Sequence, residues 1–380
     1  MGIPLRQTIR VGAYVLGQHL KGVRRYPLVL MLEPLFRCNL ACAGCGKIDY
    51  PDAILNQRLS VDECLGAVEE CGAPVVVVAG GEPLLHREID TIVKRITAQK
   101  KFVYLCTNAL LLEKKIELFH PSPYFAWTVH LDGDREDHDR SVCQQGVYDR
   151  AVAAINLAKA RGFRVNINAT FFDTAEPDRV ARFFDDVTGI GIDGITVSPG
   201  YAYERAPDQE HFLSRRRTKE LFRDIFARGT RRWSFNQSIL FLDFLAGNQT
   251  YQCTPWGNPT RNYFGWQRPC YLLGEGYAKT FKELMEETDW DAYGTGNYEK
   301  CANCMVHSGY EATAVMDSVR NPLKAAAVAL RGIRTEGEMA PEIPLDRQRP
   351  ARFVFSSHVE EAMARLRRGN EPAQSPSGAD

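Results

Sequence analysis

Three cysteines lie within eight residues of one another, in the stretch RCNLACAGCGKIDYP that runs from Arg37 to Pro51. They are Cys38, Cys42 and Cys45, and no fourth cysteine lies beside them. A structural zinc site usually takes four ligands in two pairs, whereas three thiolates suit a [4Fe–4S] cluster with one iron left open. The spacing therefore favours an iron–sulfur cluster, with zinc as the alternative.

A second set of four cysteines occurs much later in the chain, at Cys253, Cys270, Cys301 and Cys304. Four thiols that end in C-x₂-C suit structural zinc as well as a second iron–sulfur cluster, and unpaired buried thiols are a third alternative. Because the first set favours iron, we expect a second [4Fe–4S] cluster here and leave zinc open.

The composition is that of a globular protein of 380 residues, with 44% hydrophobic and 25% charged residues. Lys and Arg number 47 and Asp and Glu number 47, so no overall basic field exists to attract nucleic acid. The N-terminus lacks a signal-type apolar core, and no apolar run could span a bilayer. We therefore expect a cytoplasmic protein that keeps its thiols reduced.

Short apolar runs alternate with helical patterns from Leu28 to Ser198. One helix is predicted over Ser60–Cys71, where Ser60 and Glu63 can form a capping box. Six such units predict an α/β fold with a parallel sheet, curved like part of a (β/α)₈ barrel. The predicted strands are Leu28–Leu32, Val75–Ala79, Phe102–Cys106, Phe125–Leu131, Arg164–Phe171 and Gly194–Val197.

Residues capable of chemistry follow these strands at their carboxyl ends, where barrels of this kind carry their active sites. A single residue in such a place is more often a strand-end cap than a ligand, but here nearly every strand has one. In chain order they are Gly80, Gly81, Glu82, Cys106, Asn108, His130, Asn168 and Ser198.

The pattern changes after residue 232, where a segment rich in aromatic residues contains the second cysteine set. We predict four parts: an N-terminal basic amphipathic helix over 1–25, a partial barrel over 26–232, an auxiliary domain over 233–332, and a C-terminal extension over 333–380. The extension is predicted to hold a short helix near Val359–Arg367 and a disordered tail from Gly369.

The predicted N-terminal helix has an apolar face. It is formed by Leu5, Ile9, Ala13, Leu16, Leu20 and Val23, and it is surrounded by Arg6, Arg10, Lys21, Arg24 and Arg25. Such a helix can lie on an anionic membrane surface. An alternative of equal weight is a helix that packs on the barrel and exposes one edge to solvent.

The chain resembles the radical S-adenosylmethionine (SAM) superfamily in three motifs. They are the C-x₃-C-x₂-C spacing, the GGE of Gly80 to Glu82 and the HLDG that starts at His130. The resemblance implies a partial (β/α)₆ barrel and a cluster whose open iron binds SAM. It also implies a SAM site built from the strand-end residues named above other than Cys106. The second cysteine set resembles the "twitch" auxiliary domain of some members. One departure is Gly44, where the family usually has a bulky residue against the adenine. The adenine must then stack elsewhere, or the space has another use.

Longer segments resemble the radical SAM enzymes of hopanoid biosynthesis; they are MGIPLRQTIRVGAYVLGQHLKG, CNLACAGCGKI, AGGEPLLH and Cys253–Tyr310. The resemblance implies addition of the 5′-deoxyadenosyl radical to the alkene of a hopene such as diploptene, with a ferredoxin or flavodoxin as electron donor. Cys106 would then donate a hydrogen atom to the product radical; the alternative is a small apolar residue in the barrel wall. The space at Gly44 would admit the alkene. A maturase acting on a peptide or protein is the second hypothesis, and a non-enzymatic iron–sulfur or zinc scaffold is the third.

Overall fold

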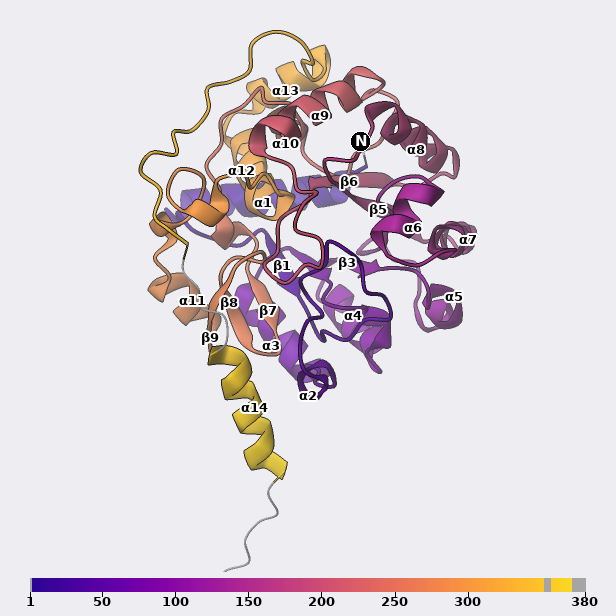
Figure 1. Cartoon of the computed structure of the whole chain (residues 1–380), viewed down its shortest axis with the longest axis vertical. Helices are drawn as coiled ribbons and strands as arrows, with labels where there is room; N and C mark the ends of the chain where they lie inside the picture. Colours follow the sequence, from indigo (N-terminus) through magenta and orange to yellow (C-terminus); the bar gives the residue numbers. More distant parts are fainter. Residues whose placement is uncertain (1, 352–356, 371–380) are drawn as a thin grey trace, which may run out of the picture.

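Six parallel strands form the main sheet of the computed structural model, which describes residues 2–351 and 357–370 (Figure 1). Each strand pairs with the next one along the chain, so the sheet is built from consecutive strand–helix–strand units. The strands are β1 (Val29–Leu32), β2 (Val75–Val78), β3 (Phe102–Thr107), β4 (Phe125–His130), β5 (Arg164–Phe171) and β6 (Gly194–Pro199). The predicted partial barrel is confirmed.

The helices between and after the strands cover the outside of this sheet (Figure 1). The predicted capping box of α3 is present, because the Ser60 Oγ accepts from the Glu63 N–H and the Glu63 carboxylate accepts from the Ser60 N–H. The helices up to β6 are α1 (Leu5–Leu20), α2 (Asp52–Leu55), α3 (Val61–Cys71), α4 (Ile89–Ala98), α5 (Leu112–Lys115), α6 (Arg135–Ser141), α7 (Val147–Ala160) and α8 (Pro177–Gly189).

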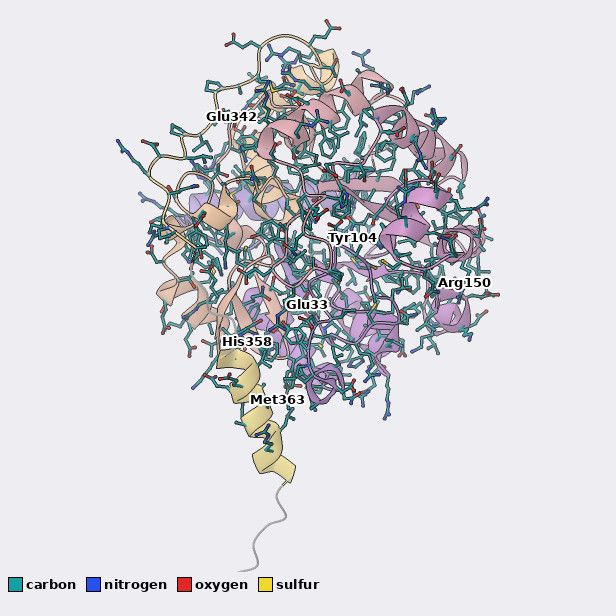
Figure 2. The ribbon with its side chains drawn as sticks, in the orientation of Figure 1. Glu33, Tyr104, Arg150, Glu342, His358 and Met363 are labelled. Carbon is teal, nitrogen blue, oxygen red and sulfur yellow. The ribbon has the colours of Figure 1, made fainter. Side chains whose placement is uncertain are left out.

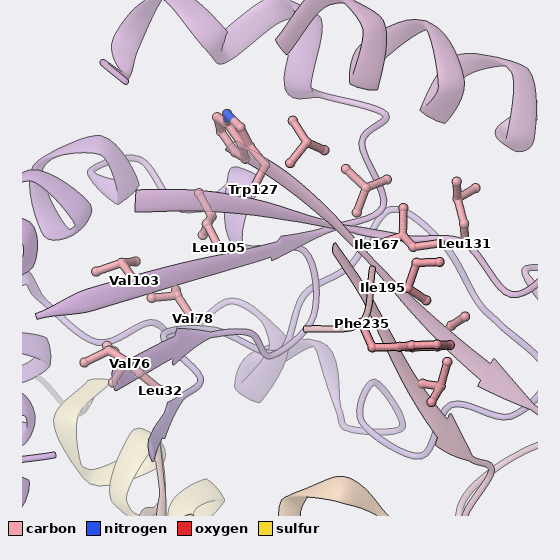
Figure 3. Packing of buried hydrophobic residues seen from close by; sticks show 14 of the residues in the cluster. Leu32, Val76, Val78, Val103, Leu105, Trp127, Leu131, Ile167, Ile195 and Phe235 are labelled. Carbon is pink, nitrogen blue, oxygen red and sulfur yellow. The ribbon is translucent and has the colours of Figure 1, made fainter. Parts of the chain in front are cut away.

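Alternate residues of each strand point to opposite sides of the sheet. The outward side chains pack beneath the helices and form the main core, in which Trp127 is fully buried (Figure 3). Cys64 and Cys71 also lie in this core. The inward side chains line a hollow inside the barrel instead. Those of β1 and β2 are Val29, Met31, Val75 and Val77, and those of β3 to β6 include Tyr104, Cys106, Thr128, His130, Asn168, Thr170, Thr196 and Ser198.

Three more strands extend the same sheet beyond β1. β7 (Thr260–Asn262) pairs in parallel with β1, and β8 (Gly265–Pro269) and β9 (Gly274–Ala278) follow in antiparallel fashion. The auxiliary segment is therefore hydrogen-bonded to the barrel rather than folded on a separate sheet. Its surroundings include α9 (Arg215–Ala227), α10 (Ile239–Leu245), α11 (Phe281–Glu287), α12 (His307–Arg320) and α13 (Pro322–Arg331).

The N-terminal helix α1 packs against α12, where Val15 lies in a buried cluster with Tyr26, Ala312 and Met316. The apolar face predicted for this helix, which includes Leu5, Ile9 and Leu16, is not part of that cluster. Within the described ranges, no helix is long and apolar enough to cross a membrane.

Near the other end of the chain, α14 (Ser357–Asn370) confirms the short helix predicted there. The ring of His358 on this helix packs edge-on against Phe264, with 4.8 Å between the ring centroids. Gly369 and Asn370 belong to the helix, so the disordered tail was predicted to begin too early. The rest of the predicted tail lies outside the described residues.

Candidate functional site

A cavity of about 1330 Å³ occupies the inside of the barrel and reaches the carboxyl ends of its strands. It brings together all the residues predicted from the first cysteine set and from the strand ends, although they come from six different parts of the chain. These residues are Cys38, Cys42, Cys45, Gly80, Gly81, Glu82, Cys106, Asn108, His130, Asn168 and Ser198.

The first cysteine set lies in the loop after β1, with all three thiols partly buried. Burial raises the pKa of the Cys38 thiol to about 11, and burial together with the neighbouring Cys45 raises the pKa of Cys42. Thiols that raise one another's pKa lie close together and repel as thiolates. A cationic group such as an iron–sulfur cluster relieves this repulsion, so the three side chains fit the predicted cluster.

Among the described residues, no group of three or more His, Cys, Asp or Glu side chains is arranged to hold a single metal ion. Hydrogen bonds around the loop help to hold it in place. The Asn108 Nδ2 donates to the Asn39 Oδ1 over 2.7 Å and lies 3.9 Å from the Cys38 Sγ. Asn108 therefore positions the cysteine loop; its predicted contact with SAM remains a prediction.

Gly80 and Gly81 allow two loops to touch through their backbones. A Cβ atom on Gly81 would lie 2.2 Å from the carbonyl oxygen of Arg37, and one on Gly80 would lie 2.3 Å from that of Leu35. The Gly81 N–H donates to the Leu35 carbonyl over 3.0 Å. In the structure, the start of the cysteine loop is what approaches the two glycines, and their predicted place in the SAM site remains a prediction.

Glu82 is fully buried beside this contact. Its carboxylate accepts hydrogen bonds from the Thr107 hydroxyl and from the N–H groups of Leu84 and Asn108, over 2.8–2.9 Å. Burial raises the pKa of Glu82 to about 7, although the three hydrogen bonds favour the ionised form. Glu82 thus ties the β2 loop to the end of β3, and acceptance of the SAM amino group would be an additional role.

His130 and Asp132 form a pair at the end of β4, with 2.8 Å between Nε2 and Oδ1. Burial alone would lower the pKa of His130, but the Asp132 carboxylate outweighs it and raises the pKa. Asp132 also accepts from the Thr170 N–H and the Ser141 hydroxyl. His130 therefore presents a polar, orientated ring to the cavity.

Phe172, which follows β5, fills the space beside Gly44. A Cβ atom on Gly44 would lie 2.8 Å from the Phe172 ring, which also lines the cavity. The expected open space at Gly44 is therefore absent. Instead, an aromatic ring from another part of the chain stands next to the third cysteine, where an adenine can stack on it. No local pattern marks Phe172, so sequence reasoning missed it.

The second cysteine set surrounds a small chamber of about 30 Å³. All four predicted ligands, Cys253, Cys270, Cys301 and Cys304, contribute to its wall. Tyr201, Leu272 and Ser308 line both this chamber and the main cavity. The four thiols therefore converge as predicted, directly behind the wall of the main cavity, and fit a second cluster.

Arg215 is a buried cation beside the chamber. Its Nη1 donates to the Cys304 carbonyl over 2.9 Å. Burial raises the pKa of Cys304 to about 12, and the Arg215 charge acts against that rise. A buried guanidinium next to four thiolates offsets part of their negative charge, which is a means of tuning a cluster.

Lys47 links the two cysteine sets. Its Nζ lies 3.3 Å from the Glu33 carboxylate and donates to the Tyr271 carbonyl, next to Cys270, over 3.0 Å. Glu33 is completely buried and lies, like Tyr104, inside the molecule (Figure 2). Sequence reasoning did not single out Lys47, although its place two residues after Cys45 was a usable signal.

The fold and the site define a radical SAM domain, and the comparisons agree. The radical SAM superfamily model matches residues 32–187, and the model of DUF3463, a domain of unknown function, matches residues 195–328. The chain thus contains a radical SAM superfamily domain over residues 32–187, followed by a DUF3463 domain over residues 195–328. The cofactors of the radical SAM domain are a [4Fe–4S] cluster and SAM.

The curated relatives match less than half of the chain. The GTP 3′,8-cyclase of Clostridium perfringens (strain SM101 / Type A) is 29% identical over 150 residues, which are 38% of this chain and 46% of that protein. The AdoMet-dependent heme synthase of Methanosarcina barkeri is 29% identical over 47% of this chain and 56% of that protein. The chain spans about half the length of these relatives.

Two solved structures share the fold. SuiB of Streptococcus suis bound to S-adenosylmethionine has a TM-score of 0.54 and 17% identity, over 64% of this chain and 60% of that one. Native anSMEcpe with bound AdoMet and a peptide has a TM-score of 0.51 and 16% identity, over 80% of this chain and 99% of that one. The match extends beyond the barrel and confirms the predicted auxiliary fold.

Gly81→Ala should destabilise the contact between the two loops, because its Cβ would overlap the Arg37 carbonyl. We expect a loss of about 1–3 kcal/mol in the free energy of unfolding and less than half the iron bound after reconstitution. Gly66→Ala is the control, because that glycine lies in α3 with open space around it. Equal iron in both variants would contradict the role given to Gly81.

Phe172→Ala should raise the dissociation constant of SAM roughly tenfold, since stacking of a base on an aromatic ring contributes about 1–3 kcal/mol. The measurement is SAM binding to the reconstituted protein by equilibrium dialysis. Adding Gly44→Tyr to Phe172→Ala restores a ring at the family's usual position and should recover affinity. Unchanged affinity in the single variant would exclude stacking on Phe172.

Arg215→Met should lower the reduction potential of a cluster in the second chamber, because a positive charge stabilises the reduced form. We expect a fall on the order of 50 mV, equivalent to a screened interaction of about 1 kcal/mol. A redox titration followed by electron paramagnetic resonance, with Cys38, Cys42 and Cys45 replaced by Ala, measures this cluster alone.

Two controls accompany this titration. Arg215→Lys keeps the charge, and Arg216→Met removes an exposed arginine of the same helix that pairs with Glu220. Both should leave the potential nearly unchanged. Zinc in place of iron in the chamber would decide for the zinc alternative.

Proposed function

We propose that the chain adds the 5′-deoxyadenosyl group to the exocyclic alkene of a hopene such as diploptene, the activity of an adenosylhopane synthase. The observation that carries this proposal is the apolar extension of the main cavity. From Cys106 the cavity continues along β1 and β2 to the inner faces of α1, α12 and α13. A bulky hydrocarbon could occupy this extension with its alkene near the SAM site.

The cavity has two chemically different parts. The inward side chains of β4 to β6 are polar, as SAM requires. The far part is lined by apolar side chains, among them Val11, Val29, Met31, Val75, Val77, Leu242, Val315 and Val319. The volume exceeds the roughly 300–1,000 Å³ of an ordinary ligand pocket, so two ligands can be held together.

The titratable groups in the far part support an uncharged ligand. Burial raises the pKa of Glu311 to about 8, so this carboxyl is mostly protonated at neutral pH. Burial lowers the pKa of His307 to about 4, so this imidazole is neutral. The arginines that reach the cavity, Arg231 and Arg331, are exposed at its rim. The interior wall therefore carries little charge, which suits a hydrocarbon.

A reduced [4Fe–4S] cluster held by Cys38, Cys42 and Cys45 would supply the electron that cleaves SAM into methionine and the 5′-deoxyadenosyl radical. Addition of the 5′ carbon to the terminal alkene carbon forms one C–C bond and leaves an unpaired electron on the tertiary carbon. Cys106 then gives its S–H hydrogen atom to that carbon. One electron from a reduced ferredoxin or flavodoxin, and one proton, restore the thiol.

Two properties of Cys106 support this role. Its side chain lies on the inward face of β3, in the wall shared by the two parts of the cavity. Burial and the nearby Glu82 carboxylate raise the pKa of the Cys106 thiol to about 12. At neutral pH the sulfur therefore keeps the hydrogen that the final step consumes.

A peptide or protein maturase is the second candidate, favoured by the shared fold with SuiB and with peptide-bound anSMEcpe. Those structures are 16–17% identical to the chain. A peptide carries many backbone donors and acceptors, and these need partners when buried. Polar side chains such as Gln7, Thr8 and Ser318 also line the far part, but apolar surface predominates in the cavity wall, which favours the hydrocarbon.

The reconstituted protein, incubated anaerobically with SAM, a strong reductant and solubilised diploptene, should form an adenosyl–triterpene adduct detectable by mass spectrometry. In D₂O the adduct should gain one deuterium on carbon, because the Cys106 thiol exchanges with solvent. Cys106→Ala should lower the yield of reduced adduct at least about tenfold while 5′-deoxyadenosine still forms, since SAM cleavage does not need this thiol.

Cys143→Ala is the matched control, because it removes an exposed thiol outside the cavity, and it should leave the adduct unchanged. Formation of 5′-deoxyadenosine with no adduct would contradict the hopene proposal and favour a peptide or protein substrate. An unaltered yield from Cys106→Ala would remove Cys106 from the reaction.

A further inference from the structure

Exposed apolar side chains are concentrated on two helices. Among the described residues, seven of the nine large apolar side chains that are strongly exposed belong to α1, to the turn after it, or to α13. We call these seven the apolar patch: Leu5, Ile9, Leu16, Leu20, Val23, Leu323 and Leu330. The other two, Leu118 and Leu345, lie apart from these helices. Such a concentration on a folded surface marks an interaction site.

The patch on α1 occupies one face of the helix. Leu5, Ile9, Leu16 and Leu20 follow in steps of four, seven and four residues, which places them in one stripe. The face that contacts the protein is a different one, and it holds Val15, which is 1% exposed. The interior of the protein therefore uses one side of α1 and leaves the apolar stripe uncovered.

The patch lies in a basic region of an otherwise neutral chain. From Gly2 to Leu32 the chain has five Lys and Arg residues and no acidic one. Arg25 is paired with Asp291, but Arg10, Lys21 and Arg24 are exposed. Around α13, no acidic residue occurs in the sequence from 318 to 335. Apolar side chains bordered by cations match the chemistry of an anionic bilayer surface.

The helices that carry the patch also form the wall of the main cavity. Thr8, Val11 and Gly12 of α1 line it, and so do Ala325, Ala326 and Ala329 of α13. Both helices pack against α12, which contributes Val315 and Val319. Most of the residues of α1 and α13 at this wall are small or slender, so each helix lies between its part of the patch and the apolar part of the cavity.

We propose that the apolar patch docks on an anionic lipid bilayer and that lipid substrate enters the cavity between α1, α12 and α13. The nature of the substrate rests on the proposed function, whereas the docking rests on the patch alone. A symmetric dimer through the same face is disfavoured, because it would bring the basic residues of two copies together.

The test is flotation of the full chain with vesicles of equal parts phosphatidylglycerol and phosphatidylcholine. The wild type should float, and should float less with phosphatidylcholine alone or at high salt. Ile9→Glu combined with Leu16→Glu should reduce the bound fraction at least about tenfold, because charged side chains replace apolar anchors. Leu118→Glu is the matched control, because Leu118 and Leu16 are both 51% exposed, and it should bind like the wild type.

Absence of flotation by the wild type, or equal loss in the control, would overturn the proposal. The proposal would also be overturned if the wild type sedimented as a dimer and did not bind vesicles, while the double variant sedimented as a monomer. The patch would then join two copies of the chain. Adduct formation from detergent-solubilised diploptene separates the two proposals. If the wild type floats but forms no adduct, the docking proposal is supported and the hopene reaction is contradicted. If the double variant no longer floats but still forms the adduct in detergent, both proposals are supported.

Discussion

The tightest constraint in the described part of the molecule is the contact between the backbone of Gly80 and Gly81 and the start of the cysteine loop. No side chain fits between them, because the missing Cβ atoms would overlap carbonyl oxygens at 2.2–2.3 Å. The contact fixes the loop after β1 against the loop after β2. Glu82 then joins both loops to the end of β3. Asn108, which follows β3, donates a hydrogen bond to Asn39 of the cysteine loop and so holds that loop in place.

Strand alternation divides the barrel interior into two environments. On β1 and β2 the inward residues are Val and Met, whereas on β4 to β6 they are mainly Thr, Asn, His and Ser. A charged cofactor and an apolar substrate can therefore be bound in the same cavity, each on its own side. Cys106 lies on β3, between the two groups of strands. That position is what a residue needs in order to act on both ligands.

The sequence was sufficient for features encoded locally. The six strands follow from apolar runs, the start of α3 from Ser60 and Glu63, and both cysteine sets from their spacing. Contacts between distant segments were not predictable in this way. Phe172 meets Gly44 although the two are far apart in the sequence, and Arg215 reaches Cys304. Glu82 finds two of its three donors at the end of the next strand. Each depends on the completed barrel, which no local pattern reveals.

The pairing of β7 with β1 has a consequence for electron transfer. β1 leads into the first cysteine loop, and β8 leads directly into Cys270, so both cysteine sets have a ligand that follows a strand of one hydrogen-bonded sheet. The register of that sheet therefore helps to set the separation of the two sets. Electron transfer between clusters bound at the two sets would then occur over a distance that the fold itself determines.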